Sequence, residues 1–375
     1  MFELTTFVIF FLQFLFVGAC LYLIMCADPN SQGILGKAHR FVYKLIPSLY
    51  SSSKDSNKQP NIFFRVADKI INYLCYTNHP LVQIFYVIVA GGGFVVYCNF
   101  GLFKHFPNQQ VSSIHIYIGS LFAFFCFYSY YLACKVSPGK ISKENVKQYT
   151  KTYEKYYDDV LFEKGNNCST CNIVKPARSK HCKTCNMCVA RFDHHCIWIR
   201  QCVGEKNYKY FLLFIGSHAL LTLYGGIIGI LCLYGIVLDS NLLYAKFRIP
   251  GSNEVIDANW SIILKYLFYK ETMFVFIIIL CIIMGITLTL FLLYHFSMIK
   301  DNMTTNERIK RSDFISFLEK ETKKMEKDLE EPDQTAENKA EKQQKLKKYK
   351  RDLDQLKKWF PTKGFKQNLK DIWNL

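Results

Sequence analysis

Five long runs of apolar residues constrain the fold of this chain more than any other feature of its sequence. They occupy residues 5–26, 81–103, 113–134, 210–238 and 272–299. A helix of about 20 apolar residues crosses the hydrocarbon core of a bilayer, which is roughly 30 Å thick. Several runs exceed that length almost without charge, which disfavours buried helices of a soluble protein. The sequence therefore predicts an α-helical multi-pass membrane protein with about five transmembrane helices.

The distribution of Lys and Arg predicts how the chain is oriented in the membrane. Positive charge is concentrated after the first run, between Lys135 and Lys209, and after Ile299. Cytosolic segments of membrane proteins carry an excess of Lys and Arg, so these three segments are predicted to be cytosolic. Segments 104–111 and 239–271 are nearly balanced in charge and are predicted to be lumenal. We assign the net charge of +17 to contact with anionic lipid headgroups, and no nucleic-acid partner is predicted.

The apolar runs and the charge pattern together divide the chain into four parts. They are N-terminal transmembrane helices with a basic cytosolic loop (1–135), a cytosolic Cys-rich domain (136–209), C-terminal transmembrane helices (210–299) and a cytosolic tail (300–375). No Lys or Arg precedes the first run and no cleavage site follows it, which predicts a retained helix. Residues 320–358 predict a solvated helix or a partly disordered arm. The aromatic end of the tail predicts either a segment at the membrane interface or a helix packed on protein.

Seven of the 15 cysteines lie between Cys168 and Cys202, within a predicted cytosolic segment. Thiols stay reduced there, so metal binding or catalysis is favoured over disulfides. The pattern C-x2-C-x9-H-x6-C occurs twice, offset by 14 residues. One set is Cys168, Cys171, His181 and Cys188; the other is Cys182, Cys185, His195 and Cys202. Three thiolates and one imidazole are typical of a closed tetrahedral zinc site, so the repeat predicts two structural Zn²⁺ ions.

The repeat leaves Cys196 without a place in either metal set. A third copy starting there would need a cysteine at position 199, which is Ile199. Beside it stand Asp193 and His194, so an imidazole is available to take the thiol proton and a carboxylate to orient the imidazole. Two interpretations stay open at this point: a nucleophilic Cys–His–Asp set, or a polar pair that supports a zinc ligand. In the first interpretation zinc supplies geometry and Cys196 supplies the chemistry.

From Cys168 to Phe211 the sequence resembles the Asp-His-His-Cys (DHHC) protein S-acyltransferases, the palmitoyltransferases. The resemblance rests on the DHHC tetrad at 193–196, on Pro176-Ala177-Arg178-Ser179-Lys180, and on Asn207 and Phe211. Two further motifs are similar to those of the family: Thr304-Thr305-Asn306-Glu307, and the tail segment 364–372 with Phe365 and Asn368. The chain departs from the family at Arg200-Gln201, where relatives usually have Asn-Asn, and at Ser137-Pro138-Gly139, where they have Asp-Pro-Gly.

The resemblance implies a four-span core, to which one predicted helix is additional, and a ping-pong reaction. Cys196 would take the acyl group of palmitoyl-CoA and pass it to a cysteine of a membrane protein, with His194 as base and acid and Asp193 orienting it. The acyl chain would lie between the helices. The segment also carries a basic field that could collect CoA, and contact with lipid headgroups is the alternative role of these cations. The field consists of Arg178, Lys180, Lys183, Arg191, Arg200, Lys206 and Lys209.

The motifs also resemble the endoplasmic reticulum branch of the family, which includes fungal enzymes that acylate SNAREs, with the active site facing the cytosol. The main alternative is a catalytically inactive, membrane-anchored zinc module that docks partner proteins. A transporter is disfavoured because few ionisable residues lie within the runs, His218 and His295 being exceptions.

Overall fold

The computed structural model describes residues 66, 69, 73, 79–248, 254–330, 336–357 and 362–374. The predicted first span, residues 5–26, lies outside the described residues, as do most of the basic segment that follows it and the aromatic pair Trp359-Phe360. The described chain forms two compact units. One contains residues 92–113 and 228–279, and the other contains 80–91, 114–227 and the chain from Leu280 onward.

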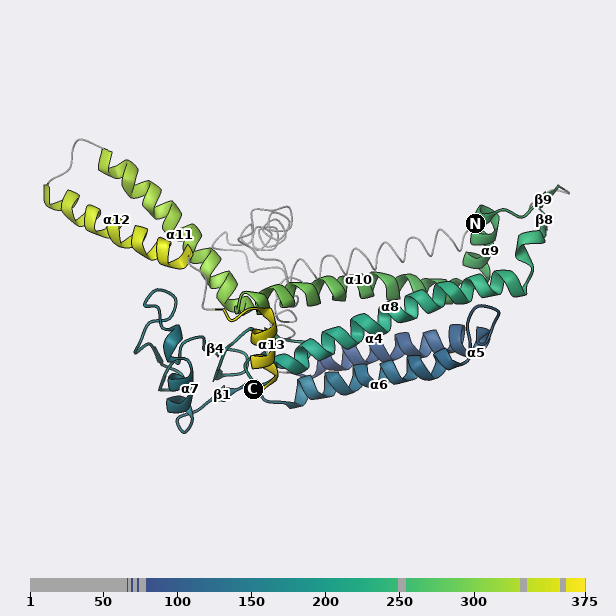
Figure 1. Cartoon of the computed structure of the whole chain (residues 1–375), viewed down its shortest axis with the longest axis horizontal. Helices are drawn as coiled ribbons and strands as arrows, with labels where there is room; N and C mark the ends of the chain where they lie inside the picture. The colour runs from purple at the N-terminus through teal and green to yellow at the C-terminus, as the bar shows by residue number, and fades with distance from the viewer. Residues whose placement is uncertain are drawn as a thin grey trace. The chain divides into compact units, whose positions relative to one another are not determined.

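Four helical segments of the described chain are long and apolar enough to cross a membrane: Leu81–His105, Ile114–Lys135, Tyr208–Asp239 and Thr272–Lys300. They confirm four of the five predicted runs. The first combines α4 (Leu81–Tyr97), a π-helical turn (Cys98–Leu102) and α5 (Phe103–His105), and the others are α6 (Ile114–Lys135), α8 (Tyr208–Asp239) and α10 (Thr272–Lys300) (Figure 1). Large apolar side chains such as Ile88, Phe124 and Leu290 are exposed on these helices, as expected for surfaces in contact with lipid.

The unit that contains residues 92–113 and 228–279 holds the predicted lumenal segments. Its short elements are a 3₁₀ turn (Leu242–Tyr244), the hairpin of β8 (Lys246–Arg248) and β9 (Val255–Asp257), and α9 (Trp260–Lys270). Glu271, at the start of α10, is buried and accepts hydrogen bonds from Lys104 at 2.6 and 2.9 Å. His105 lies 3.0 Å from the same carboxylate. This ion pair ties the end of α5 to the start of α10.

The second unit holds the Cys-rich segment, which folds into short hairpins. Its elements are β1 (Lys140–Ile141), α7 (Val146–Thr152), a 3₁₀ turn (Glu154–Tyr156), β2 (Asn167–Cys168), β3 (Ile173–Val174), β4 (Lys180–Cys182), β5 (Met187–Val189), β6 (His194–Cys196) and β7 (Gln201–Val203). The pairs β2–β3, β4–β5 and β6–β7 are antiparallel, and β1 extends the middle hairpin in the order β1-β5-β4. The sequence repeat is thus a repeat of hairpins.

Each of the three hairpins has one residue with a left-handed backbone conformation at the same position of its turn. Asn172, Asn186 and Arg200 have φ values of 51°, 48° and 55°, and they are spaced by the 14 residues of the repeat. Asn tolerates this conformation better than most residues with a Cβ atom, which accounts for the first two. Arg200 occupies the same strained position in the third hairpin. The departure from Asn at this position therefore keeps the turn geometry.

The described part of the tail is mainly helical, as the first of the two interpretations of residues 320–358 predicts. It comprises α11 (Thr305–Glu330), α12 (Ala336–Lys357) and α13 (Phe365–Trp373), and α11 and α12 lie side by side as a hairpin (Figure 1). Leu318 of α11 and Leu356 of α12 are buried in one core with the first metal-site hairpin. In α13, Asn368 donates hydrogen bonds to the carbonyls of Ile299 and Lys300 at 2.9 and 3.3 Å. Those carbonyls belong to the last turn of α10, where the regular helical hydrogen bonds end, so Asn368 helps to cap that helix.

Candidate active site

The two predicted metal sets are each assembled in the structure. In both sets the four ligand atoms lie within 4.8 Å of one another. His181 Nδ1 lies 3.5, 3.3 and 3.8 Å from the sulfurs of Cys168, Cys171 and Cys188. His195 Nδ1 lies 3.6, 3.3 and 3.8 Å from those of Cys182, Cys185 and Cys202.

These distances can be tested against a tetrahedral metal. Zinc bonds of about 2.3 Å to sulfur and 2.0–2.1 Å to nitrogen, at a tetrahedral angle, separate the two ligand atoms by about 3.5 Å. The observed range of 3.3 to 3.8 Å brackets that value in both sets. Both clusters therefore suit zinc, and Nδ1 is the nitrogen that each histidine offers.

Strand alternation separates His195 from its two neighbours. Successive side chains of a strand point to opposite faces, so His195 faces the metal donors while His194 and Cys196 share the other face of β6. The hairpin register supports this, because His195 pairs with the metal-set residue Cys202, and Cys196 pairs with Gln201. Cys196 belongs to neither donor cluster. The structure thus brings Cys196 and His194 together and keeps both away from the metal donors.

Asp193, His194 and Cys196 form a connected polar chain. His194 Nδ1 lies 2.7 Å from Asp193 Oδ2, and Cys196 lies within hydrogen-bonding range of His194. Partial burial lowers the pKa of His194, but Asp193 and Cys196 outweigh this effect and raise it to about 10. Burial raises the pKa of Cys196, but its hydrogen bond with His194 and the backbone N–H groups of Ile199 and Trp198 bring it below its usual value. A lowered pKa favours the thiolate, which is the nucleophilic form.

The third hairpin directs a backbone N–H at the sulfur of Cys196, in the same way as the second hairpin directs one at the sulfur of the metal-set residue Cys182. Cys196 stands 14 residues after Cys182, whose sulfur accepts the N–H of Cys185 at 3.4 Å. The corresponding donor to Cys196 is the N–H of Ile199. Both turns therefore direct a backbone N–H at a sulfur, although Ile199 cannot bind metal. This is a geometry in which a thiolate is stabilised without a metal ion.

Asp193 is also hydrogen-bonded to the first residue of α11. Its Oδ1 accepts the backbone N–H of Thr305 at 2.7 Å, and its Oδ2 accepts the Thr305 hydroxyl at 3.0 Å. Asp193 is almost fully buried, which raises its pKa, but His194 and Thr305 outweigh this and hold the pKa below its usual range. The sequence singled out Thr304–Glu307 as a motif but did not show what it contacts. In the structure it fixes the carboxylate that orients His194.

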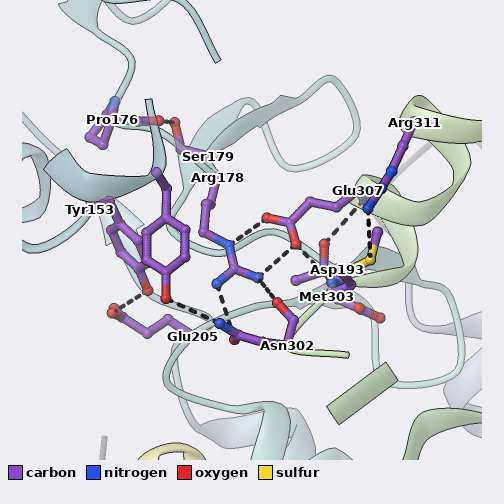
Figure 2. A network of polar contacts seen from close by, with 12 residues as sticks. Tyr153, Pro176, Arg178, Ser179, Asp193, Glu205, Asn302, Met303, Glu307 and Arg311 are labelled. Atoms are coloured by element: carbon purple, nitrogen blue, oxygen red, sulfur yellow. Dashed lines mark hydrogen bonds and ion pairs between the residues drawn. The ribbon is translucent and has the colours of Figure 1, made fainter. Parts of the chain in front are cut away.

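A buried ion pair anchors the same motif to the Cys-rich segment (Figure 2). Arg178 Nε and Nη2 donate to the two carboxylate oxygens of Glu307, both at 2.6 Å, and both side chains are almost completely buried. Arg178 Nη2 also donates to the Asn302 carbonyl at 2.8 Å, and the guanidinium lies over the Tyr156 ring at 4.6 Å. Glu307 in turn accepts the N–H of Thr304 at 2.8 Å.

This pair corrects one sequence-based expectation. Arg178 was assigned to the basic field that would collect CoA, but its guanidinium is buried and paired with Glu307. Lys180 and Lys209 are partly engaged as well, because they donate to Asn306 Oδ1 at 2.7 Å and to the Trp373 carbonyl at 3.0 Å. The charge of Arg178 therefore stabilises the site and is not free to bind an anion.

Removal of Glu307 should affect the site more than removal of a surface carboxylate. Glu307→Ala would leave the Arg178 guanidinium buried without its counter-ion, which typically costs 3–5 kcal/mol, on the order of half the stability of a domain. The N–H of Thr304, the residue before Thr305, would also lose its acceptor. We expect a lower unfolding temperature of the purified protein.

Glu326→Ala is the matched control on the same helix. Its partner Lys350 lies 2.7 Å away, but both side chains are about half exposed, so this pair contributes roughly 0–1 kcal/mol. Equal effects of the two substitutions would contradict the anchoring role of Glu307.

The two departures from the family pattern have structural roles near the site. Gln201, in β7, donates two hydrogen bonds to the carbonyls of Ala133 and Val136, at the end of α6. Tyr130 of α6 donates to the Trp198 carbonyl at 3.0 Å, so the end of α6 is bonded to both sides of the Cys196 turn. At the other departure the Ser137 hydroxyl accepts the N–H of Gly139 at 3.4 Å, and the φ of 95° at Gly139 favours glycine there.

Comparisons with known proteins agree with this geometry. A family model described as DHHC palmitoyltransferase matches residues 161–312, which include both metal sets, Cys196 and the Thr304–Glu307 motif. The chain is 38% identical to palmitoyltransferase SWF1 of Neurospora crassa over 160 residues, which cover 42% of this chain and 35% of that protein. It is 32% identical to palmitoyltransferase swf1 of Emericella nidulans over 283 residues, 75% of this chain and 65% of that protein.

A mammalian relative is matched over more of its own length. The chain is 30% identical to palmitoyltransferase ZDHHC4 of Rattus norvegicus over 252 residues, which cover 66% of this chain and 71% of that protein. The two fungal relatives are spanned over less than two thirds of their length. The family model covers α8 and α10 as well as most of the Cys-rich segment, and with the rat relative it shows that the chain belongs to the DHHC palmitoyltransferase family.

Proposed function

We propose that this membrane protein is a protein S-palmitoyltransferase that carries the acyl group on Cys196. The observation that carries the proposal is the division within β6. His195 is grouped with the metal donors, whereas Cys196 is outside both donor sets and is hydrogen-bonded to a histidine that Asp193 orients. A thiolate, an adjacent base and a carboxylate are the parts that nucleophilic acyl transfer requires.

In the first step the Cys196 sulfur attacks the carbonyl carbon of palmitoyl-CoA. A Cys196 thioester forms, the bond to the CoA sulfur breaks, and CoA leaves as the free thiol after taking a proton from His194. In the second step His194 removes the proton of a substrate cysteine, whose sulfur attacks the Cys196 thioester and releases the Cys196 thiolate. His194 Nδ1 is occupied by Asp193, so Nε2 is the nitrogen that exchanges the proton.

The eight residues of the two donor sets would hold two structural Zn²⁺ ions. When bound, each ion cross-links hairpins and contributes folding free energy, with no coordination position left for substrate. The chain's own residues supply the reactive groups. Residues 136–209 would therefore act as a folded cytosolic platform between the helices of 1–135 and 210–299, with the tail of 300–375 supporting Asp193.

Palmitoyl-CoA has one part suited to the membrane and one suited to the cytosol. Each CH₂ removed from water contributes about 0.8 kcal/mol, so the acyl chain belongs among the apolar helices. The charged end of CoA requires cations, and Lys183 is an exposed cation of the Cys-rich segment. A site at the end of the transmembrane helices would bind both the acyl chain and the charged end of CoA.

We place the protein in the endoplasmic reticulum membrane with the active site facing the cytosol. Its substrates would be membrane proteins with a cysteine near the bilayer, such as SNAREs. The support is the excess of Lys and Arg in the segments that carry the site, together with similarity to the fungal relatives.

The orientation predicts which Asn-x-Ser/Thr sequence receives a glycan. Any N-linked sugar is expected on Asn259, which is exposed in the predicted lumenal loop, and Asn259→Gln should abolish it. Asn302 is buried against Arg178, and Asn167 lies in a metal-site hairpin, so neither should be modified. Mapping by mass spectrometry after glycosidase treatment tests this, and sugar on Asn167 would reverse the orientation.

Incubation of the purified full-length protein with labelled palmitoyl-CoA tests the reaction itself. We expect label on the protein that neutral hydroxylamine removes, because hydroxylamine cleaves thioesters. The alternative function, a membrane-anchored zinc adaptor, predicts a folded, zinc-loaded protein that takes no label. That result would overturn the proposed enzyme.

A further inference from the structure

His295 is a buried histidine beside the site for which the proposed reaction has no role. It lies on α10 and is only 1% exposed. Its Nδ1 is 2.9 Å from the hydroxyl of Tyr208, the first residue of α8, which is buried as well. A histidine within a membrane helix is costly unless its polar atoms are used, and such residues commonly serve function.

The ring of His295 is fixed by aromatic neighbours on two helices. Phe291, one turn earlier on α10, lies edge-on at 4.7 Å between ring centroids, and Phe211 of α8 lies edge-on at 5.3 Å. Edge-to-face rings at these separations attract each other beyond the burial of their area. Together with the Tyr208 hydrogen bond, these contacts leave the His295 ring little freedom to rotate.

His194 is enclosed by two of these same rings. Phe211 lies edge-on to the His194 ring at 5.1 Å, and the His295 ring lies 6.5 Å from it with an interplanar angle of 38°. Asp193 holds His194 through Nδ1 at 2.7 Å. Three kinds of contact therefore set the position of the His194 ring: the hydrogen bond with Asp193, the contact with Cys196, and the neighbouring rings of Phe211 and His295, which we call the aromatic wall.

We propose that His295, oriented by Tyr208, is a positioning residue that keeps the His194 ring in place while Cys196 is acylated. The proposal rests on the proposed function. In the free enzyme the Cys196 sulfur is a hydrogen-bond partner of His194 and helps to hold it. Once the Cys196 sulfur is bound in a thioester it carries no charge, so its hydrogen bond with His194 is weakened. The aromatic wall must then hold the His194 ring while the acyl group is transferred to the substrate cysteine.

The need for histidine at this position follows from the Tyr208 hydroxyl. A buried hydroxyl without a partner costs about 1–3 kcal/mol, and His295 Nδ1 supplies that partner. Phenylalanine at position 295 would keep a ring but leave the Tyr208 hydroxyl unpaired. Replacing both partners with phenylalanine would remove the polar pair and retain both rings, which is often close to neutral.

The two half-reactions should respond differently to His295→Ala. Acyl-enzyme formation is measured as the burst of CoA release from palmitoyl-CoA. Transfer is measured by adding a synthetic peptide with one cysteine beside an apolar helix to preformed acyl-enzyme. We expect transfer to slow by about 10- to 100-fold, the scale of a small misplacement of a reacting group, and acylation by less than about threefold. Zinc content should not change.

A double-mutant cycle provides the control for mere structural damage. His295→Phe should slow transfer, and the double variant His295→Phe/Tyr208→Phe should recover most of the lost rate. Equal slowing of both half-reactions, an unchanged transfer rate, loss of zinc, or a double variant no faster than His295→Phe would each overturn the positioning role. The same measurement on the wild-type protein distinguishes failure of the positioning role from failure of the proposed function. If the wild-type protein forms no acyl-enzyme, the proposed enzyme itself is refuted.

Discussion

Cys196→Ser is expected to retain two zinc ions and the fold while losing the acyl-enzyme completely. Cys196 lies outside both donor sets, so its sulfur contributes nothing to metal binding. Serine keeps the size of the side chain, but its hydroxyl has a far higher pKa than a thiol and cannot form a thioester. The measurement is zinc content by elemental analysis beside hydroxylamine-labile label from palmitoyl-CoA, on the same sample of purified protein.

His194→Ala is the partner variant for this prediction. It should also keep both zinc ions, but acylation should slow by about 10²- to 10⁴-fold, the usual contribution of a positioned general base. Loss of a zinc ion from Cys196→Ser, or full activity in it, would show that the ligand and nucleophile roles are assigned wrongly. Cys126→Ser is a suitable control, since Cys126 is a buried cysteine of α6 outside both metal sets.

Cys185→Ser and His195→Ala are expected to release zinc and unfold the Cys-rich segment. Each removes one of the four donors of a cluster, and the second cluster shares the β4–β5 hairpin with the first. Structural zinc contributes on the order of 10 kcal/mol in peptides of this kind, which exceeds the whole stability of many domains. A strong chelator should therefore abolish acyl transfer even though the reaction needs no open metal position.

The order of events distinguishes structural from catalytic zinc. If zinc is structural, protease sensitivity of the segment should rise together with zinc release, and activity should fall in the same step. Refolding with added zinc should restore activity in wild type but not in His195→Ala. Activity that survives removal of both ions would contradict the structural role.

Local spacing explains why so much of the site could be predicted from the sequence. The three sulfurs that His181 contacts are 13, 10 and 7 residues away in the chain, so one hairpin and its neighbour complete the set. The 14-residue repeat then identified Cys196 by exclusion, and strand alternation in β6 gives the physical basis, since adjacent residues face opposite sides. The long apolar runs likewise needed no tertiary information, because bilayer thickness alone sets their length.

The support of the site depended on contacts that no local pattern contains. Asp193 is held by Thr305, 112 residues away, Arg178 pairs with Glu307 across 129 residues, and Tyr208 meets His295 across 87. From the sequence alone Arg178 was one cation among many, and His295 was a histidine near the end of a span. The sequence by itself determined which residues form the two donor sets and which thiol is left over, because hairpin spacing and strand alternation are local properties of the chain. Only the tertiary structure decided what holds Asp193 and His194 in place, because that requires the packing of α8, α10 and α11 around one short strand.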